Sequence, residues 1–211
     1  MNELFGNFIF VRILFIIIIT LIGMGVIDDL KKKDKIRIEK YLSPKKINIS
    51  LLLEYLFLTF IIRIVLEQLI LFLPFKETTA QVPSNIFEII VEFITTCIFA
   101  PIFEEITFRF GLYKKLNKKY NVVISMIITS LVFAIVHLYN VDGIIILSVL
   151  ALMWNYSFYK TNNLMYPIML HFFHNTYALS SNLFNYGSYW CVFLGISIIG
   201  YVIMKIKKQK K

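Results

Sequence analysis

Two adjacent carboxylates, Glu104 and Glu105, lie in an apolar stretch of this sequence, and Arg109 follows the second by four residues. A charge inside hydrocarbon costs at least about 2.5–3.5 kcal/mol, so it needs a partner or a function. Glu105 and Arg109 share one helix face and are predicted to pair. Glu104 is turned about 100° away from Glu105. It is therefore free to serve as a general base.

The three histidines of the chain all lie in or beside apolar stretches. His137 follows Phe133 by one helical turn, and His171 and Asn175 lie one turn apart on a later helix face. His174 is turned about 60° from His171. One such histidine would most often make a hydrogen bond between helices. A carboxylate pair, two imidazoles and an amide on three helices instead point to a functional site, not to isolated structural hydrogen bonds.

The other charges in apolar stretches are predicted to be structural. Arg63 and Glu67 are four residues apart and should form a pair on one helix face. Three further carboxylates are expected to line a polar interior or lie near the interfaces, namely Glu54, Glu88 and Glu92.

The composition indicates an integral membrane protein. Hydrophobic residues make up 58 % of the 211 positions and charged residues 17 %, whereas soluble domains have about 45–50 % and about 25 %. We therefore expect an all-α fold, a polytopic transmembrane helical bundle that forms a single membrane domain over residues 1–211. The residues that could take part in a reaction place its functional core at about 86–184.

Seven stretches are predicted to span the membrane, because a span needs about 20 mainly apolar residues, with a range of about 17–25. They are residues 8–27, 50–73, 86–109, 122–139, 144–159, 164–184 and 189–206. The fifth is the shortest. The first lacks the basic start and small-residue cleavage site of a signal peptide, so it is kept as a span.

The basic residues predict how the chain is oriented in a cell membrane. Of the 22 Lys and Arg residues, eighteen lie between alternate spans or in the C-terminal tail if residues 28–49 are cytoplasmic, and only Lys76 lies on the other side. This segregation follows the positive-inside rule and predicts a multi-pass protein with its N-terminus outside and its C-terminus in the cytoplasm. Attraction to anionic headgroups of the lipid bilayer explains the net charge of +9, and no nucleic-acid partner is expected.

Three motifs occur in order on separate predicted helices: Glu-Glu-x-x-x-Arg, Phe-x-x-x-His and His-x-x-x-Asn. This ordered set resembles the CPBP (CAAX protease and bacteriocin-processing, Abi) family of intramembrane proteases. The matching residues are Glu104, Glu105, Arg109, Phe133, His137, His171 and Asn175. The arginine of this family is commonly followed by Gly, whereas Phe110 intervenes here before Gly111.

The resemblance implies roles for these residues in peptide-bond hydrolysis. Glu104 and His137 would hold and deprotonate a water molecule, and His171 and Asn175 would stabilise the oxyanion. Glu105 with Arg109 would hold the helix and tune Glu104. His137 and His171 with Glu104 would also suit a catalytic Zn²⁺, although the same groups could work without a metal, as a glutamate-activated water.

The implied substrates are hydrophobic or membrane-associated peptides or proteins. The richness in Ile, Lys and Asn is typical of an AT-rich bacterial genome, which favours bacterial peptide or bacteriocin processing, or related immunity, over CAAX maturation. Two alternatives are a non-catalytic membrane immunity or scaffold protein and a small proton- or metal-coupled transporter. A transporter would be expected to show inverted repeats, and none is visible.

One expectation conflicts with a shared site. Counted from the predicted inner ends of their spans, Glu104 and His171 lie about 10 Å deep, whereas His137 lies about 24 Å deep. The three side chains would meet only if the helix that carries His137 were placed differently.

Overall fold

The computed structural model describes residues 2–34, 37–70, 72, 83, 85–137 and 141–184. Every regular element in these ranges is helical, which confirms the predicted all-α class. The principal helices are α1 (Asn2–Asp34), α2 (Ile49–Ile70), α6 (Val122–Ile135), α7 (Val141–Thr161) and α8 (Met165–Phe184). Between α2 and α6 runs one continuous helix, which consists of α3 (Ile86–Glu92), α4 (Ala100–Glu105), α5 (Lys114–Leu116) and two π-helical segments, Phe93–Phe99 and Ile106–Tyr113.

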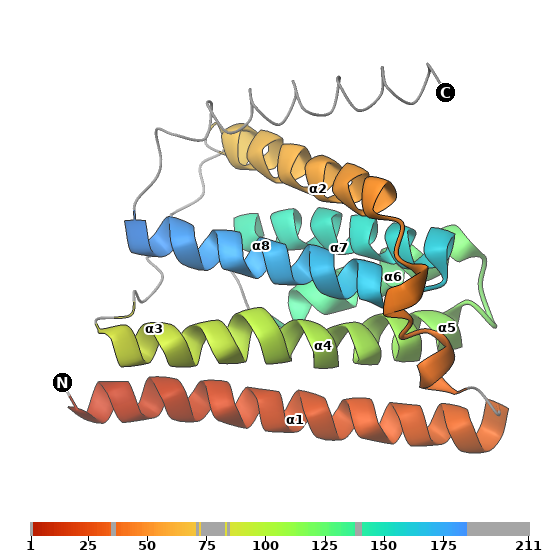
Figure 1. Ribbon diagram of the computed structural model, residues 1–211, viewed down its shortest axis with the longest axis horizontal. Coiled ribbons are helices and arrows are strands. Elements are labelled where there is room, and N and C mark those ends of the chain that lie inside the picture. Colours follow the sequence, from red (N-terminus) through yellow and green to blue (C-terminus); the bar gives the residue numbers. More distant parts are fainter. Residues whose placement is uncertain are drawn as a thin grey trace.

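These helices form a bundle in which α6, α7 and α8 lie between two outer helices. Figure 1 shows α1 running beside the continuous helix at one side of the bundle and α2 at the opposite side, next to α7 and α8. The bundle therefore encloses α4 and α8, the elements that carry the paired carboxylates and two of the histidines.

Three of the described helices are long and apolar enough to cross a membrane: α2, the continuous helix Ile86–Leu116, and α7. They confirm the spans predicted at 50–73, 86–109 and 144–159. The helix α6 is apolar but only 14 residues long. The number of seven spans is not confirmed, so the spans at 8–27, 122–139 and 164–184 stay predictions, and the span at 189–206 lies outside the described residues.

Several helices extend beyond the bounds predicted for their spans or end before them. The third helix extends past residue 109 to Leu116, because Phe110 and Tyr113 are buried in the core rather than at a membrane surface. The helix α6 ends at Ile135 instead of 139, where the backbone tightens and His137 N donates to Ala134 O (3.3 Å). The helix α7 covers 21 residues, so the shortest predicted span is long enough to cross.

Small buried residues allow α6 and α7 to pack closely. Ser125, Thr129, Ser130 and Ala134 of α6 are all buried. Asn155 of α7 donates its amide to Ser130 Oγ at 2.9 Å. Small residues and interhelical hydrogen bonds are the usual means of helix association within a membrane. The packing of α6 on α7 therefore fixes the position of the turn after α6, which carries His137.

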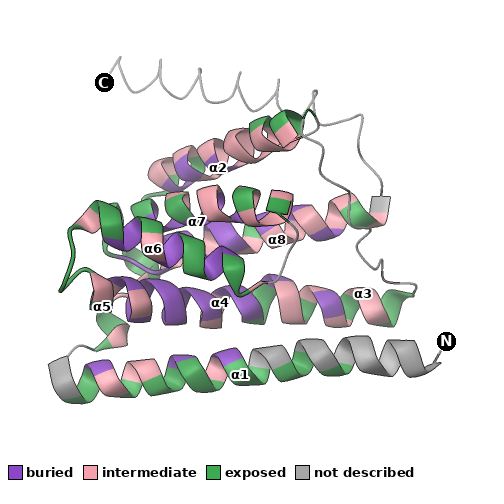
Figure 2. Ribbon diagram, turned by 180° about the vertical axis from the view of Figure 1, so that it is seen from behind, coloured by how far each residue is buried: buried purple, intermediate pink, exposed green. Residues whose placement is uncertain are grey.

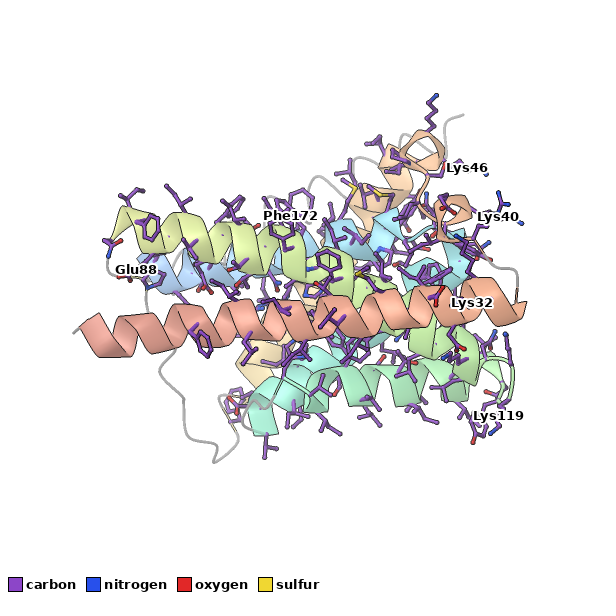
Figure 3. The ribbon with its side chains drawn as sticks, turned by 90° about the horizontal axis from the view of Figure 1, so that it is seen from below. Lys32, Lys40, Lys46, Glu88, Lys119 and Phe172 are labelled. Carbon is purple, nitrogen blue, oxygen red and sulfur yellow. The ribbon has the colours of Figure 1, made fainter. Side chains whose placement is uncertain are left out.

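The basic segments that were predicted to share one side of the membrane lie at one end of the bundle. Figure 3 shows Lys32, Lys40, Lys46 and Lys119 at this end and Glu88 at the other. Three contacts join the segments: Leu164 N with Tyr41 O (2.8 Å), Asn163 Nδ2 with Ser43 O (2.9 Å), and Lys115 Nζ with Asp29 Oδ2 (2.5 Å). The left-handed Asn162 (φ 49°) ends α7 and turns the chain into α8 at this same end.

Close packing of α1 against the continuous helix depends on Gly111. A Cβ at this position would overlap Val26 Cγ1, whereas a Cβ at Gly25 would meet nothing within 4 Å. The neighbouring Phe110, which departs from the family pattern, is fully buried, with its ring centroid 5.3 Å from that of Tyr41. The bulky residue thus packs on the loop after α1, and the glycine next to it allows the two helices to approach.

We expect Gly111→Ala to destabilise the protein by about 1–3 kcal/mol, the usual cost of overpacking. Gly25→Ala should be neutral or stabilising, because alanine in a helix is favoured over glycine by roughly 0.5–1 kcal/mol. Thermal unfolding of the two variants in the same detergent tests this difference. Adding Val26→Ala should restore most of the stability lost in Gly111→Ala, and equal unfolding temperatures for the two glycine variants would contradict the packing described.

Candidate active site

Glu104 and Glu105 lie at the end of α4, between the two π-helical segments. Both side chains are buried, with Glu104 2 % exposed and Glu105 fully covered. Figure 2 shows buried residues concentrated on α4 and on the helical turns that follow it. Short π-helical stretches in α-helices frequently occur at functional sites, and here they flank the only adjacent pair of glutamates in the sequence.

The predicted pairing of Glu105 with Arg109 is confirmed. Arg109 Nε lies 2.9 Å from Glu105 Oε2, and both side chains are fully buried. Arg109 also donates Nη2 to the carbonyl oxygen of Ala151 in α7 (3.3 Å), and its Cζ lies 4.5 Å from the centroid of the Phe133 ring. This ion pair therefore ties the continuous helix to both α6 and α7.

Glu105 also holds His171. His171 Nδ1 lies 2.9 Å from Glu105 Oε1. An ionised carboxylate only accepts hydrogen bonds, so Nδ1 carries the hydrogen and donates it. This leaves His171 Nε2 directed to the other carboxylate, 3.8 Å from Glu104 Oε2. Glu105 thus links Arg109 to the imidazole on α8.

His137 approaches Glu104 from a different helix in the same manner. Its Nδ1 lies 2.6 Å from the carbonyl oxygen of Phe133, which only accepts, so Nδ1 donates. His137 Nε2 lies 3.4 Å from Glu104 Oε2. Glu104 Oε2 is buried and has no hydrogen bond within the part of the chain described. Such buried unsatisfied acceptors are uncommon, and catalytic groups are one explanation for them.

The structure brings the three side chains together although the depths counted for them from the sequence differ. Glu104 lies twelve residues before the end of its helix at Leu116, which is about 18 Å at 1.5 Å per residue. His137 follows α6 in the turn after Ile135, so its side chain reaches Glu104 from the far end of that helix. The two histidines and Glu104 therefore meet deep within the bundle.

Asn175 is the predicted site residue whose hydrogen bond leads away from this cluster. It lies one turn after His171 on α8, and its Nδ2 donates to the carbonyl oxygen of Thr96 at 2.8 Å. Thr96 belongs to the first π-helical segment. The structure thus brings together Glu104, Glu105, Arg109, His137 and His171, with Asn175 held beside them by the same helix.

Sequence reasoning missed two features around the site. Trp154 of α7 stacks on His171, with ring centroids 4.4 Å apart. The second feature is a set of contacts between α2 and α8.

The predicted pair of Arg63 and Glu67 is confirmed, with Arg63 Nε 2.7 Å from Glu67 Oε1. Its contacts to α8 were not foreseen, however, because spacing along one helix says nothing about another. They join Arg63 Nη1 to the two ring nitrogens of His174 (2.9 and 3.1 Å) and Tyr177 Oη to Glu67 Oε2 (3.2 Å).

The side chains that would hold a metal here are His137, His171 and Glu104. The Nε2 atoms of both histidines and Glu104 Oε2 are of the donor types that catalytic zinc uses, and fixed Nδ1 donors are common in such sites. No group of three or more His, Cys, Asp or Glu side chains within the described ranges is arranged to hold a metal ion. The donor types therefore fit and their arrangement does not, so no step below is routed through a metal.

Helices long and apolar enough to cross a membrane enclose a buried glutamate and two imidazoles, an arrangement expected of an intramembrane hydrolase. The comparison with protein families supports this class. Residues 86–177 match the family model described as "Type II CAAX prenyl endopeptidase Rce1-like". The chain thus carries a domain of this family of intramembrane proteases, which confirms the resemblance to the CPBP family. The matched range contains all six predicted site residues, and no curated protein or solved structure matches.

Proposed function

We propose that this protein is an endopeptidase that hydrolyses hydrophobic or membrane-associated peptides with a water molecule activated by Glu104 and His137. The observation that carries the proposal is the approach of two imidazole Nε2 atoms to one buried carboxylate oxygen, Glu104 Oε2, at 3.4 and 3.8 Å. A carboxylate and an imidazole in this relation supply the acceptor and the positioning group that general-base attack requires.

In the proposed reaction, Glu104 takes a proton from water while the water oxygen attacks the carbonyl carbon of the scissile bond. His137 Nε2 orients the water. The C–N bond then breaks, and the leaving amine nitrogen takes the proton from Glu104. The groups return to their starting states, with one water consumed for each peptide bond cleaved.

The developing oxyanion would be stabilised from α8. His171 donates through Nε2 when its ring carries both hydrogens, and Glu105, 2.9 Å from Nδ1, offsets that charge. Asn175 has two amide hydrogens and uses one of them on Thr96 O, so the second is the proposed additional donor. Donors that are fixed before the reaction supply large rate effects. Arg109 and Glu105 hold these groups in place.

The substrate class is tested in cells, because the geometry selects no sequence. Comparative peptidomics of cells that express the wild type, Glu104→Ala and Glu39→Ala should show a set of membrane-derived peptides that disappears only in Glu104→Ala. Glu39 is an exposed carboxylate in the loop before α2, so its variant is the matched control. Identical peptides in all three strains would overturn the proposal and favour a binding or immunity function for the same fold.

The proposed orientation puts the basic end of the bundle in the cytoplasm. In a protein whose Cys97 and Cys191 are replaced by Ser, a cysteine at exposed Lys119 should react with an impermeant maleimide only from the cytoplasmic side. A cysteine at exposed Ile86, at the other end of the same helix, should react only from the outer side. Labelling of Lys119→Cys in intact cells would contradict this topology.

A further inference from the structure

Trp154 is buried at the centre of the site, although the proposed reaction does not use it. It lies on α7 with no exposed surface. Its ring stacks on the His171 imidazole, with centroids 4.4 Å apart and an angle of 20° between the planes. The same indole lies 5.5 Å from Arg109 Cζ and edge-on to His174 at 5.4 Å. It therefore contacts both histidines of α8 and the buried arginine.

The hydrogen bond to Glu105 alone does not fix the orientation of His171. The ring turns only about the Cα–Cβ and Cβ–Cγ bonds, and a single hydrogen bond of 2.9 Å to Glu105 Oε1 still allows small combined rotations about these bonds. Such rotations would move Nε2 away from Glu104 Oε2. A flat indole against one face of the imidazole removes this freedom, and Phe133, edge-on at 5.6 Å, contacts the ring as well.

Tryptophan is an unfavourable choice if the position requires only apolar filling. Trp154 Nε1 is buried and has no hydrogen-bond partner in the part of the chain described. An indole N–H can only donate a hydrogen bond, and a buried donor left without a partner destabilises the fold. The other buried donors of α7 each make a hydrogen bond, Asn155 to Ser130 Oγ and Ser157 to Trp154 O, and the remaining buried side chains of this helix carry no polar group. The broad ring face itself is what this position requires.

We infer that Trp154 is a positioning residue for the proposed reaction: its indole face holds the His171 ring in the plane that directs Nε2 to Glu104. This inference rests on the proposed function for its kinetic consequence, but the orientation of the ring is a property of the resting protein. Helix α7 contributes no reacting group, but through Trp154 it sets the orientation of the His171 imidazole on α8.

The kinetic test compares Trp154→Leu, Trp154→Phe and the control Tyr156→Leu, an exposed aromatic residue on the same helix. Trp154→Leu should lower kcat by about 10- to 100-fold, as expected when a catalytic group is slightly misplaced. Its KM should stay within about twofold of the wild type, because the indole is not proposed to bind substrate. Trp154→Phe retains a flat face and should recover most of the activity.

A second measurement does not depend on activity. The chain has three histidines, so a protein labelled only in histidine gives three ring signals by NMR, and His171→Gln assigns one of them. Loss of the stacked indole should shift the His171 ring protons downfield in Trp154→Leu, while Tyr156→Leu leaves them unchanged. If Trp154→Leu does not fold, Trp154→Met replaces it, because the unbranched and flexible methionine adapts to irregular gaps in a core.

The two measurements separate the possible failures. An unchanged His171 signal in the folded Trp154→Leu or Trp154→Met protein would overturn the inference, whether or not the protein is a protease. Equal losses of kcat in Trp154→Phe and Trp154→Leu would also overturn it, since the N–H rather than the ring face would then be required. A shifted signal in a protein that cleaves nothing would support the stacking of Trp154 on His171 and count against the proposed function alone.

Discussion

Glu104→Gln is expected to lower kcat for peptide cleavage by about 10²–10⁴-fold, the usual contribution of a general base. Glutamine keeps the size and shape of the side chain, so the bundle should still insert and fold. It has no carboxylate to accept a proton from water between His137 and His171, which approach this side chain at 3.4 and 3.8 Å. Cleavage of a substrate found by peptidomics, measured with purified protein in nanodiscs, tests this.

The control for this variant is Glu54→Gln, a carboxylate on the membrane-crossing helix α2. It should retain cleavage within about threefold, because changes away from the site remove no transition-state interaction. Similar rates for Glu104→Gln and Glu54→Gln would show that Glu104 is not the base. A loss of cleavage in both would indicate a general effect of removing charges from this bundle.

Arg109→Met is expected to have the largest effect on stability, a loss of about 3–5 kcal/mol, because it leaves a buried charge without its partner. Glu105 is fully buried and has Arg109 Nε 2.9 Å away. Without the arginine, the carboxylate keeps only the hydrogen bond from His171 Nδ1, so the charge is relieved by protonation of Glu105 or His171 or by opening of the bundle. Thermal unfolding in detergent, together with the yield of folded protein from membranes, measures the effect.

The double variant Glu105→Gln/Arg109→Met should recover much of that stability, since no charge is then buried alone. It should not recover activity, because Glu105 also positions His171. Arg63→Met is the matched control, and it should cost less because Glu67, the partner of Arg63, is 31 % exposed. Equal instability of the single and double variants at 105 and 109 would contradict the ion-pair explanation.

The class of fold and one half of the site could be predicted because they depend on short-range rules. Apolar runs of membrane length gave the helices, of which α2, Ile86–Leu116 and α7 meet the criteria for a span. Spacing of four residues gave the pairs of Glu105 with Arg109 and of Arg63 with Glu67. Such pairs need only one helix to form, so no knowledge of packing is required.

Contacts between helices could not be predicted in the same way. Trp154 lies in an apolar stretch like any core residue, and only the packing of α7 on α8 puts it against His171. The end of the third helix at Leu116 was missed for a related reason. Phe110 packs on Tyr41 in the loop after α1, and Tyr113 packs on Phe158 of α7. No local sequence pattern reveals these contacts.

Single-turnover cleavage in water enriched in oxygen-18 tests most directly whether Glu104 activates a water molecule rather than attacking the peptide itself. If Glu104 activates a water molecule, the first turnover of the nanodisc-bound protein puts one solvent oxygen into the new carboxyl terminus of the product, while Glu104 stays unlabelled. A first-turnover product without the label, with the label on Glu104 instead, would contradict the activation of water by Glu104. The absence of any cleavage would contradict it as well.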